Sequence, residues 1–166
     1  MDIIFERKSV RKYQNKPVEK EKVEKLLRAA MQAPSAGNQQ PWEFLVIQDK
    51  TTLKKLSEMS QYSRMLDGAG LAVVLLGNTE RIRMMGYWEQ DMGAATENLL
   101  LEAVELGLGA VWLGVSPMQD RMNYISNLFD LPENIKPFSI VSVGYPAEDR
   151  GFTDRYDEKR VHFEKY

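Results

Sequence analysis

The sequence contains no cysteine and only one histidine, His162, which lies close to the C-terminal end of its 166 residues. The missing cysteines exclude disulfide bonds, thiolate catalysis and cysteine-based zinc or iron–sulfur sites. A single histidine likewise excludes a histidine metal cluster, so we expect no metal site. A chain of this length buries about 68–70% of the surface that its unfolded form exposes, so residues 1–166 can fold as one domain without such staples.

Long apolar runs and a strong net charge are also missing. The longest apolar run, residues 68–77, is far shorter than the roughly 20 residues of a membrane-spanning helix, and a charged residue follows Met1 at once. We therefore expect neither a membrane span nor a signal peptide. The formal net charge of −2 argues against a nucleic-acid binder. Together with the lack of cysteine, these features predict a soluble, cytoplasmic protein.

The sequence signatures of side-chain catalysis and of nucleotide binding are missing as well. It has no GxxxxGKS or GxxxxGKT, no HExxH and no GxSxG pattern. The stretch GLGAVW, residues 107–112, looks like the start of a dinucleotide fingerprint, but it lacks the third glycine. It also leads from a predicted helix into a predicted strand, which is the reverse of the required order. These absences favour a protein whose bound cofactor does the chemistry, so we assign no catalytic side chain.

Hydrophobic periodicity predicts helices that alternate loosely with four short apolar strands, which gives one sheet with helices on both faces. A first helix is expected to begin at a cap formed by Asp2, and a third at a cap formed by Thr51 or Thr52. The other expected helices are residues 19–32, 88–106 and a segment around Met122–Phe129. The expected strands are residues 43–49, 71–77, 109–115 and 138–146.

The helix expected over residues 88–106 is apolar most of the way round, which predicts that it is buried. Small residues at 93–96, with the sequence GAAT, make one stretch of it slim. Another backbone can therefore come close there. The sequence leaves open whether that backbone belongs to the same chain or to a partner.

A cluster of four cations surrounds one hydroxyl in the stretch ERKSVRKY, residues 6–13. If this stretch were helical, Arg7 and Arg11 would lie on one face and repel each other. A phosphate monoester between them would relieve the repulsion, because guanidinium groups donate charge-assisted, partly bidentate hydrogen bonds. The hydroxyl of Ser9 would add a further donor. The alternative is a solvated basic surface, which this stretch alone does not exclude.

A proline-bracketed loop and a strand end offer further binding groups. In PSAGNQQPW, residues 34–42, small residues let backbone N–H groups approach a flat ligand, and the amide side chains both donate and accept. The prolines stiffen this loop, which lowers the cost of ordering it. In VWLGVSP, residues 111–117, the strand end at Gly114 exposes N–H groups to a ring nitrogen or a carbonyl. The alternatives are an ordinary connector and an ordinary strand end, and Arg160 alone would be a solvated charge.

Taken together, these stretches resemble the nitroreductase family of flavin mononucleotide enzymes, in its compact form. The resemblance covers nearly the whole chain, in the order and at the spacing of the family. It implies an α+β fold, namely a three-layer α/β/α sandwich with a mixed, mostly antiparallel sheet, in an obligate dimer with exchanged C-terminal tails. The stretches that carry the resemblance are RKSVRKY at 7–13, APSAGNQQPWEF at 33–44, ENLLLEAVELGLGAVWLG at 97–114, SVGYPAE at 142–148 and KRVHF at 159–163.

The resemblance further implies that FMN binds at the interface of a homodimer. The basic motif would grip the phosphate, with Lys8 alongside on the flavin, where the family often has arginine. The PSAGN loop would meet a flavin held mainly by the other subunit, and the strand end would direct a backbone N–H near N5 of the isoalloxazine. The tail arginine would be a second phosphate contact. The residues so implied are Arg7, Lys8, Ser9, Arg11, Pro34, Ser35, Asn38, Trp112, Leu113, Gly114 and Arg160.

The reaction that the resemblance implies is a ping-pong oxidoreduction. NADH or NADPH would deliver hydride to the flavin and leave, and a nitroaromatic, quinone or similar small acceptor would then take the electrons in the same pocket. The long pocket-shaping insertions of larger family members are not seen, so the acceptor is poorly constrained. The short segment at residues 81–87 is either a cap on the pocket or a surface turn, and we favour the turn.

Three alternatives to this function stay open on the sequence. The first is a flavin-binding storage or sensing protein without turnover, which would use the same binding residues. The second is a related flavin enzyme with different chemistry, such as reductive dehalogenation or flavin destruction. The third is a plain interaction domain, in which each of these clusters has its ordinary structural role.

Overall fold

The structure, a computed structural model, describes residues 2–148, 151 and 153–166. Its regular elements follow one another as helices and single strands, with short 3₁₀ turns between them. In chain order they are α1 (Ile3–Glu6), α2 (Lys20–Met31), η1 (Ala36–Asn38), β1 (Trp42–Ile47), α3 (Lys50–Ser57), η2 (Arg64–Gly68), β2 (Leu71–Asn78), η3 (Met85–Tyr87), α4 (Trp88–Glu105), β3 (Gly109–Gly114), α5 (Gln119–Leu128), β4 (Ile135–Gly144) and η4 (Glu158–Arg160).

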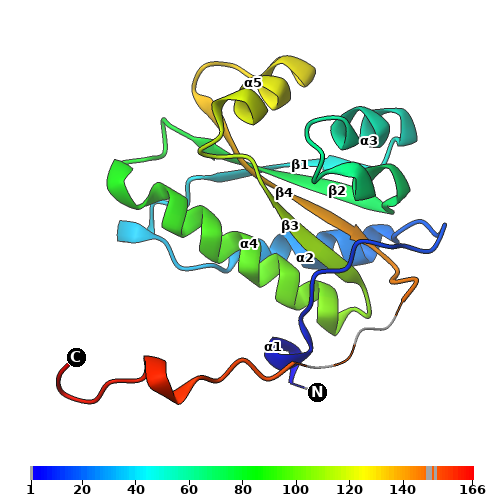
Figure 1. Cartoon of the computed structure of the whole chain (residues 1–166). Coiled ribbons are helices and arrows are strands. Elements are labelled where there is room, and N and C mark those ends of the chain that lie inside the picture. The colour runs from blue at the N-terminus through cyan, green and yellow to red at the C-terminus, as the bar shows by residue number, and fades with distance from the viewer. Residues whose placement is uncertain (1, 149–150, 152) are drawn as a thin grey trace.

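The four strands form one sheet in the order β1–β2–β4–β3, and every neighbouring pair is antiparallel. The helices α2 and α4 cover one face of this sheet, and α3 and α5 cover the other (Figure 1). The expectation of a three-layer α/β/α sandwich in the α+β class is therefore confirmed. Among the described residues, the parallel component is one isolated bridge, between Ser9 and Ala110.

The central strand β2 shows why two helical layers are needed. It is buried along nearly its whole length, and its side chains alternate between two separate cores. Leu71, Val73 and Leu75 belong to the core under α2 and α4, whereas the intervening residues belong to the core under α3 and α5. Because successive strand residues point to opposite faces, a run of apolar residues requires cover on both sides.

The long helix α4 ends at the glycine that the sequence indicates. Gly107 has φ of +68°, a left-handed conformation that costs glycine little. The N–H of Leu108 donates to the carbonyl of Ala103 at 2.7 Å, and the N–H of Gly107 donates to Val104 at 2.9 Å. These two bonds make a Schellman motif, which satisfies the last carbonyls of the helix and turns the chain directly into β3.

Of the two helix caps expected from the sequence, the position of the first is confirmed and the second is wrong. The cap of α3 is Asp49, not Thr51 or Thr52, because its carboxylate accepts from the backbone N–H and the hydroxyl of Thr52 at 2.7 and 2.8 Å. These bonds from Thr52 lower the pKa of Asp49. At α1, the side chain of Asp2 makes no capping hydrogen bond, although its backbone carbonyl accepts from Phe5 and Glu6.

The strand β4 begins at Ile135, three residues before the start expected from its apolar run, so Pro137 lies inside the strand. Proline cannot donate to a ladder and is tolerated at bulges and at unpaired edges. Here the register of β2 against β4 shifts between Leu75 and Leu76, where Leu76 faces Pro137. On the other side, the pairing of β3 reaches only to Ser139. The proline therefore lies where no ladder donor is required of it.

The segment from Arg7 to Arg11 is extended, so the helical placement of its two arginines is wrong. The helix α1 ends at Glu6, and Arg7 has φ of −60° and ψ of 126°. The N–H of Val10 donates to the carbonyl of Ala110 at 2.9 Å, which attaches the segment to the free edge of β3. A side chain at Gly109 would stand 2.6–2.8 Å from Val10, so glycine is required for this close approach.

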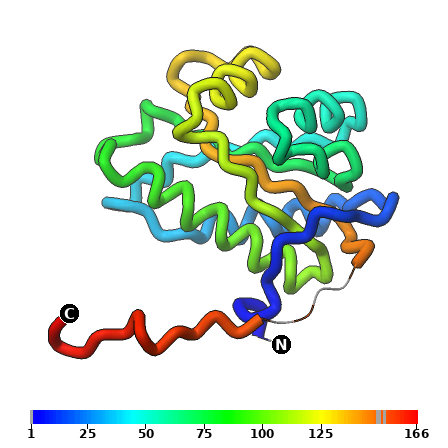
Figure 2. Tube along the Cα trace, in the orientation of Figure 1, coloured from blue at the N-terminus to red at the C-terminus, as the bar shows by residue number. Residues whose placement is uncertain are grey.

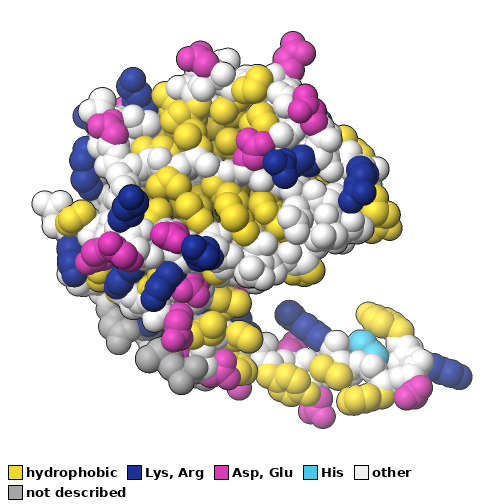
Figure 3. Space-filling view, turned by 180° about the vertical axis from the view of Figure 1, so that it is seen from behind, with side chains coloured by type: hydrophobic (Ala, Val, Ile, Leu, Met, Phe, Trp, Pro, Cys, Tyr) yellow, Lys and Arg dark blue, Asp and Glu magenta, His cyan; other side chains and the backbone are white. Residues whose placement is uncertain are grey.

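The C-terminal tail runs away from the rest of the chain, as the backbone traces show (Figures 1 and 2). Its aromatic side chains are uncovered, with Tyr156 74% exposed and Phe163 83% exposed. Figure 3 shows the tail projecting below a body that presents a broad apolar surface on the same side. Among the helices of the described residues, none combines the length and the apolar character that crossing a bilayer requires.

We predict that Gly109→Ala detaches the Arg7–Arg11 segment from β3. The new methyl group would meet the branched side chain of Val10, which has little freedom to move. We expect the free energy of unfolding, measured by urea denaturation, to fall by about 1–3 kcal/mol. Gly68→Ala is the control, because nothing lies within 4 Å of its new carbon. Equal denaturation midpoints for the two variants would contradict the role assigned to Gly109.

Candidate functional site

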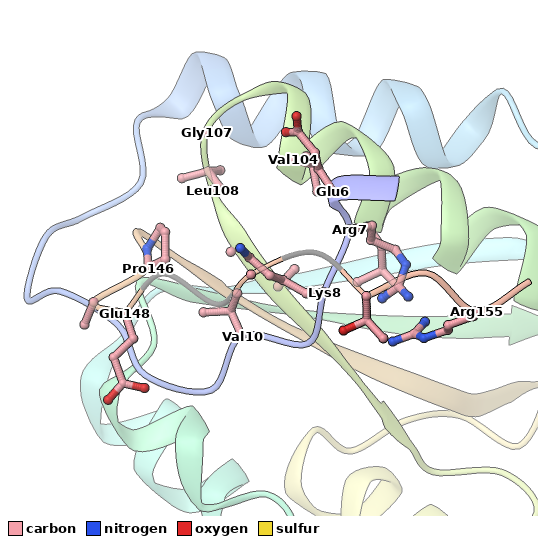
Figure 4. A pocket seen from close by; sticks show the side chains of 16 residues that line it. Glu6, Arg7, Lys8, Val10, Val104, Gly107, Leu108, Pro146, Glu148 and Arg155 are labelled. Atoms are coloured by element: carbon pink, nitrogen blue, oxygen red, sulfur yellow. The ribbon is translucent and has the colours of Figure 1, made fainter. Parts of the chain in front are cut away.

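The N-terminal basic residues line a cavity of about 590 Å³ between α1, the C-terminal half of α4, the start of β3 and the base of the tail. Figure 4 shows Arg7 and Arg155 at one end of this cavity and Pro146 and Glu148 at the other, with Lys8 between them. Its floor is apolar and includes the backbone of Gly109. Three cations and two carboxylates, Glu6 and Glu148, line the cavity. With Arg7 and Arg155 together at one end, that end of the cavity suits the charged group of an organic anion.

The guanidinium of Arg7 is held in place by α4. Its Nε lies 3.3 Å from Oε1 of Glu97, and the Arg7 side chain is only 21% exposed. Because a partly buried ion pair fixes both side chains, the remaining N–H groups of Arg7 have a defined direction. Glu97 begins one of the stretches that resemble the family, but only the folded chain shows that it pairs with Arg7.

A second cavity, of about 390 Å³, lies at the other end of the same segment. Arg11 lines it together with the strand end that the sequence analysis singled out, Trp112, Leu113 and Gly114. The structure therefore brings these four predicted residues together. It also separates Arg11 from Arg7 and Lys8, which line the first cavity.

Arg121 is a contributor to this second cavity that the sequence analysis missed. Its Nη1 donates to the carbonyl of Gly114 at 2.8 Å, so the guanidinium is fixed against the strand end. The sequence does place Arg121 in the first turn of α5, seven residues after Gly114, which was the available indication that it could reach the strand end. With Arg11 it gives the cavity two guanidinium groups, which favours a ligand with several acceptor oxygens.

The indole of Trp112 forms an aromatic wall over the sheet end. It is 36% exposed, and its ring centroid lies 5.8 Å from that of Phe138. A side-chain carbon at Gly93 would stand 3.6 Å from the indole, so the slim stretch of α4 lies beside this ring. At Gly93, the neighbour that the missing side chain admits within one chain is therefore the indole of Trp112.

The loop with Pro34, Ser35 and Asn38 lies at the N-terminal end of α4 and lines neither of these two cavities. Its shape is set by local hydrogen bonds. The hydroxyl of Ser35 accepts from the N–H of Gln40 at 3.0 Å, and the side-chain oxygen of Asn38 accepts from the amide of Gln40 at 2.8 Å. Within one chain, these three predicted residues are therefore not brought to the basic motif.

The tail arginine Arg160 is likewise distant from the basic motif in its own chain. It is exposed, its Nε lies 3.0 Å from Oδ2 of Asp157, and it lines neither cavity. Arg155, five residues earlier, lines the first cavity instead. Arg155 has no recognisable role in the sequence, because a single charge in a polar tail carries no local signal.

The residue Tyr13 anchors the end of the basic segment to the sheet. Its hydroxyl donates to the carbonyl of Val10 at 2.7 Å and lies 3.2 Å from that of Ser142. Burial raises the pKa of Tyr13 to about 12, against the smaller lowering effects of its bond to Ser142 and of the nearby Arg11 charge. The neutral hydroxyl is therefore favoured in the folded chain.

Comparison with known proteins gives consistent matches along the chain. The Nitroreductase family profile matches residues 4–63 and 59–145. The chain belongs to the nitroreductase family. A relative from Archaeoglobus fulgidus, provisionally named NADH dehydrogenase/NAD(P)H nitroreductase, is 44% identical over 170 residues, covering 100% of this chain and 98% of the relative.

Solved structures agree with this nitroreductase fold. A crystal structure from Clostridium acetobutylicum, provisionally named NADH oxidase, matches with a TM-score of 0.98 and 57% identity over 99% of this chain and 100% of that chain. A nitroreductase-like protein from Desulfovibrio desulfuricans, solved in complex with FMN, matches with a TM-score of 0.85 and 30% identity over 99% of this chain and 95% of that chain. The compact size of the present chain is thus shared by relatives of nearly equal length.

We predict that Tyr13 makes the stability of the protein fall at alkaline pH. Because the folded chain raises its pKa from about 10 to about 12, its contribution is complete below pH 10 and is lost as the pH rises towards 12. The loss amounts to at most about 3 kcal/mol. Urea unfolding across this range should show it in the wild type but not in Tyr13→Phe. Tyr166→Phe, at a fully exposed position, should keep the wild-type profile, and identical profiles for all three proteins would contradict the assignment.

Proposed function

We propose that this nitroreductase-family protein is an FMN-dependent oxidoreductase that uses NADH or NADPH to reduce nitroaromatics, quinones or similar small acceptors by a ping-pong mechanism. The observation that carries the proposal is the attachment of the basic segment to the edge of β3. This attachment places Arg11 in one cavity with Trp112, Leu113 and Gly114, and places Arg7 and Lys8 in another cavity at the opposite end of the segment.

The described residues fit FMN as an elongated anion with one charged and one planar end. Extended backbone from Arg7 to Arg11 spans roughly 13 Å, so one ligand can reach both cavities. We assign the phosphate to Arg7, with Lys8 alongside, because these two residues share a cavity with the cation Arg155. Ser9 lines neither cavity and lies opposite Ala110 on the edge of β3, so its hydroxyl is assigned to the phosphate on the family resemblance alone. When bound, FMN would supply the chemistry, accepting hydride from a nicotinamide and passing electrons to the acceptor.

The role of Arg11 in this proposal differs from the one expected from the sequence. Since Arg11 shares a cavity with the strand end rather than with Arg7, we assign it to the oxygens of the isoalloxazine and not to the phosphate. The indole of Trp112 and the exposed Gly114 would lie along the ring system. β3 is an edge strand, and the N-terminal segment attaches to it near Ala110, whose carbonyl accepts from the N–H of Val10. A backbone N–H of the strand end beyond this attachment would then reach N5.

We propose in addition that the active form is a homodimer, with the flavin at its interface. The loop of Pro34, Ser35 and Asn38 lines neither cavity of its own chain, so its contact with flavin requires a second chain. The uncovered tail aromatics and the apolar surface beside them (Figure 3) have the character of an interface. Exchange of the tails would also bring Arg160 to the partner's phosphate.

The first test is the visible absorption spectrum of the purified wild type and of Arg11→Glu. The wild type should show a bound-flavin spectrum that bleaches anaerobically with NADH or NADPH, and the faster nicotinamide identifies the donor. Arg11→Glu should lose flavin, because a carboxylate beside the ring oxygens repels them. Arg28→Glu, on the exposed side of α2, is the matched control and should stay yellow.

Each contrary spectrum has a definite meaning. A wild type that stays yellow with both nicotinamides would favour flavin storage or sensing over turnover. A folded Arg11→Glu variant with full flavin content would refute the place given to Arg11. A colourless wild type that also fails to bind added FMN would refute the proposed function.

A second prediction concerns the tail. Deleting residues 156–166 removes Arg160 and the uncovered aromatics, so the protein should become monomeric and lose its flavin while keeping its fold. Sedimentation equilibrium measures the oligomeric state, the visible absorption spectrum the flavin content, and circular dichroism the fold. The charge change Lys159→Glu alone, which leaves the aromatics in place, should remain dimeric. A truncated chain that is still a flavin-containing dimer would show that tail exchange is not required.

A further inference from the structure

A buried polar network joins three parts of the chain at the N-terminal end of α4. Asp91, in the first turn of α4, is 5% exposed, and Gln39, in the loop before β1, is 6% exposed. One carboxylate oxygen of Asp91 accepts from the N–H of Ala36 at 2.8 Å, and the other accepts from Nε2 of Gln39 at 2.5 Å. A carboxylate near a helix N-terminus is also stabilised by the helix dipole.

The other end of the Gln39 side chain holds the turn of residues 83–87. Its Oε1 accepts from the backbone N–H of Arg83 at 3.0 Å and from that of Met84 at 2.9 Å. Two backbone donors on one side and a carboxylate on the other fix the orientation of the amide. Gln39 therefore bridges the turn and the helix, and it cannot flip without losing at least two hydrogen bonds.

Direct contacts also join the turn to the loop that contains Pro34, Ser35 and Asn38. The guanidinium of Arg83 donates to the carbonyl of Gly37 at 2.8 Å. The sulfur of Met84 lies so near Gly37 that a side-chain carbon there would stand 3.3 Å from it. The turn itself is exposed, as expected for residues 81–87, with Met85 51% and Tyr87 49% exposed.

The loop is held in a backbone conformation that it would not adopt by itself. Gly37, Asn38 and Gln40 have φ of +54°, +52° and +45°. Left-handed backbone at residues other than glycine costs free energy and persists only where the surroundings impose it. Gln39 lies between the two non-glycine residues Asn38 and Gln40, and its hydrogen bonds to Asp91, Arg83 and Met84 supply that constraint.

We infer that Gln39 and Asp91 are positioning residues for the acceptor-binding half of the reaction. By locking the loop and the turn into one rigid unit, they would set where Ser35 and Asn38 meet the flavin of the partner subunit. They would also set where the exposed Met84, Met85 and Tyr87 stand beside it, as an apolar wall for a planar aromatic acceptor. This inference rests on the proposed function, since it assumes that the loop contacts flavin.

Gln39 donates and Asp91 accepts in the hydrogen bond between them, so the network can be tested by exchanging the amide and the carboxylate between the two positions. Gln39→Glu alone places two carboxylates at hydrogen-bond distance, and Asp91→Asn alone sets two amide N–H groups against each other. In the double variant Gln39→Glu/Asp91→Asn, the asparagine would accept from Ala36 and donate to the new carboxylate, which still accepts from Arg83 and Met84. The bonds to Ala36, Arg83 and Met84 N–H and the bond between the two side chains are thus restored, with the charge moved to the other partner. Only the long contact from Nε2 of Gln39 to the carbonyl of Met84, at 3.5 Å, is lost.

The measurements are steady-state kinetics with para-benzoquinone as acceptor and the rate of tryptic cleavage after Arg81 and Arg83. Each single variant should raise the KM for the quinone about tenfold, with a smaller change in kcat, because misplacement of a contacting loop weakens acceptor binding. Cleavage at the two arginines should accelerate, because the turn is released. The double variant should return both quantities to within about twofold of the wild type.

Thr96→Val is the matched control for a purely structural effect. Thr96 is fully buried on the same helix, donates to the carbonyl of Met92 at 2.7 Å and contacts Ser139, and touches neither loop nor turn. It should lower the melting temperature without changing the KM. The inference is overturned if Thr96→Val raises the KM as much as the single variants do, if those variants leave the KM unchanged, or if the double variant is not rescued. A wild type that binds no FMN would instead refute the proposed function, and the inference with it.

Discussion

The attachment of the extended N-terminal segment to the edge of β3 is the interaction on which the candidate site depends. It consists of little more than the bond from the N–H of Val10 to Ala110, the bare backbone of Gly109 and the hydroxyl of Tyr13. None of these groups need contact a ligand. They nevertheless decide that cations from the first residues of the chain lie beside a strand that follows them by about a hundred residues. A charge cluster that would otherwise be solvated thereby becomes part of two cavities.

Two arginines of this region each have a protein partner that orients the guanidinium group. Arg7 is held by Glu97, and Arg121 by the carbonyl of Gly114. A guanidinium with one side committed to the protein still has N–H groups free to donate, and their direction is set in advance. Such preorganisation lowers the entropy that binding must lose. The buried carboxylate of Asp91 follows the same logic, because its partners are neutral donors that hold a loop and not a competing cation.

The two ends of α4 contribute to different parts of the proposed site. Its C-terminal half and the Schellman turn form one wall of the cavity with Arg7, whereas its N-terminal end anchors the loop of Ser35 and the exposed turn. The helix is too long for both ends to serve one ligand in the same chain, since 18 residues extend roughly 27 Å. In a pair of chains, the C-terminal end of α4 from one chain could meet the N-terminal end of α4 from the other. The proposed flavin site therefore requires the proposed dimer.

The sequence by itself determined the helices and strands, their approximate limits and the three-layer arrangement, because apolar periodicity and the glycine after α4 act locally. It missed details that depend on neighbours in space, such as the tolerance of Pro137 at a bulge and the choice of Asp49 as a cap. The family was apparent from motifs at Arg7–Tyr13 and around Ser35. Only the tertiary structure decided that Arg11 joins Trp112 rather than Arg7, that Arg121 and Arg155 take part, and that Gln39 ties a loop to α4. Such pairings arise between segments far apart in the sequence, and no local pattern encodes which of several similar side chains will meet.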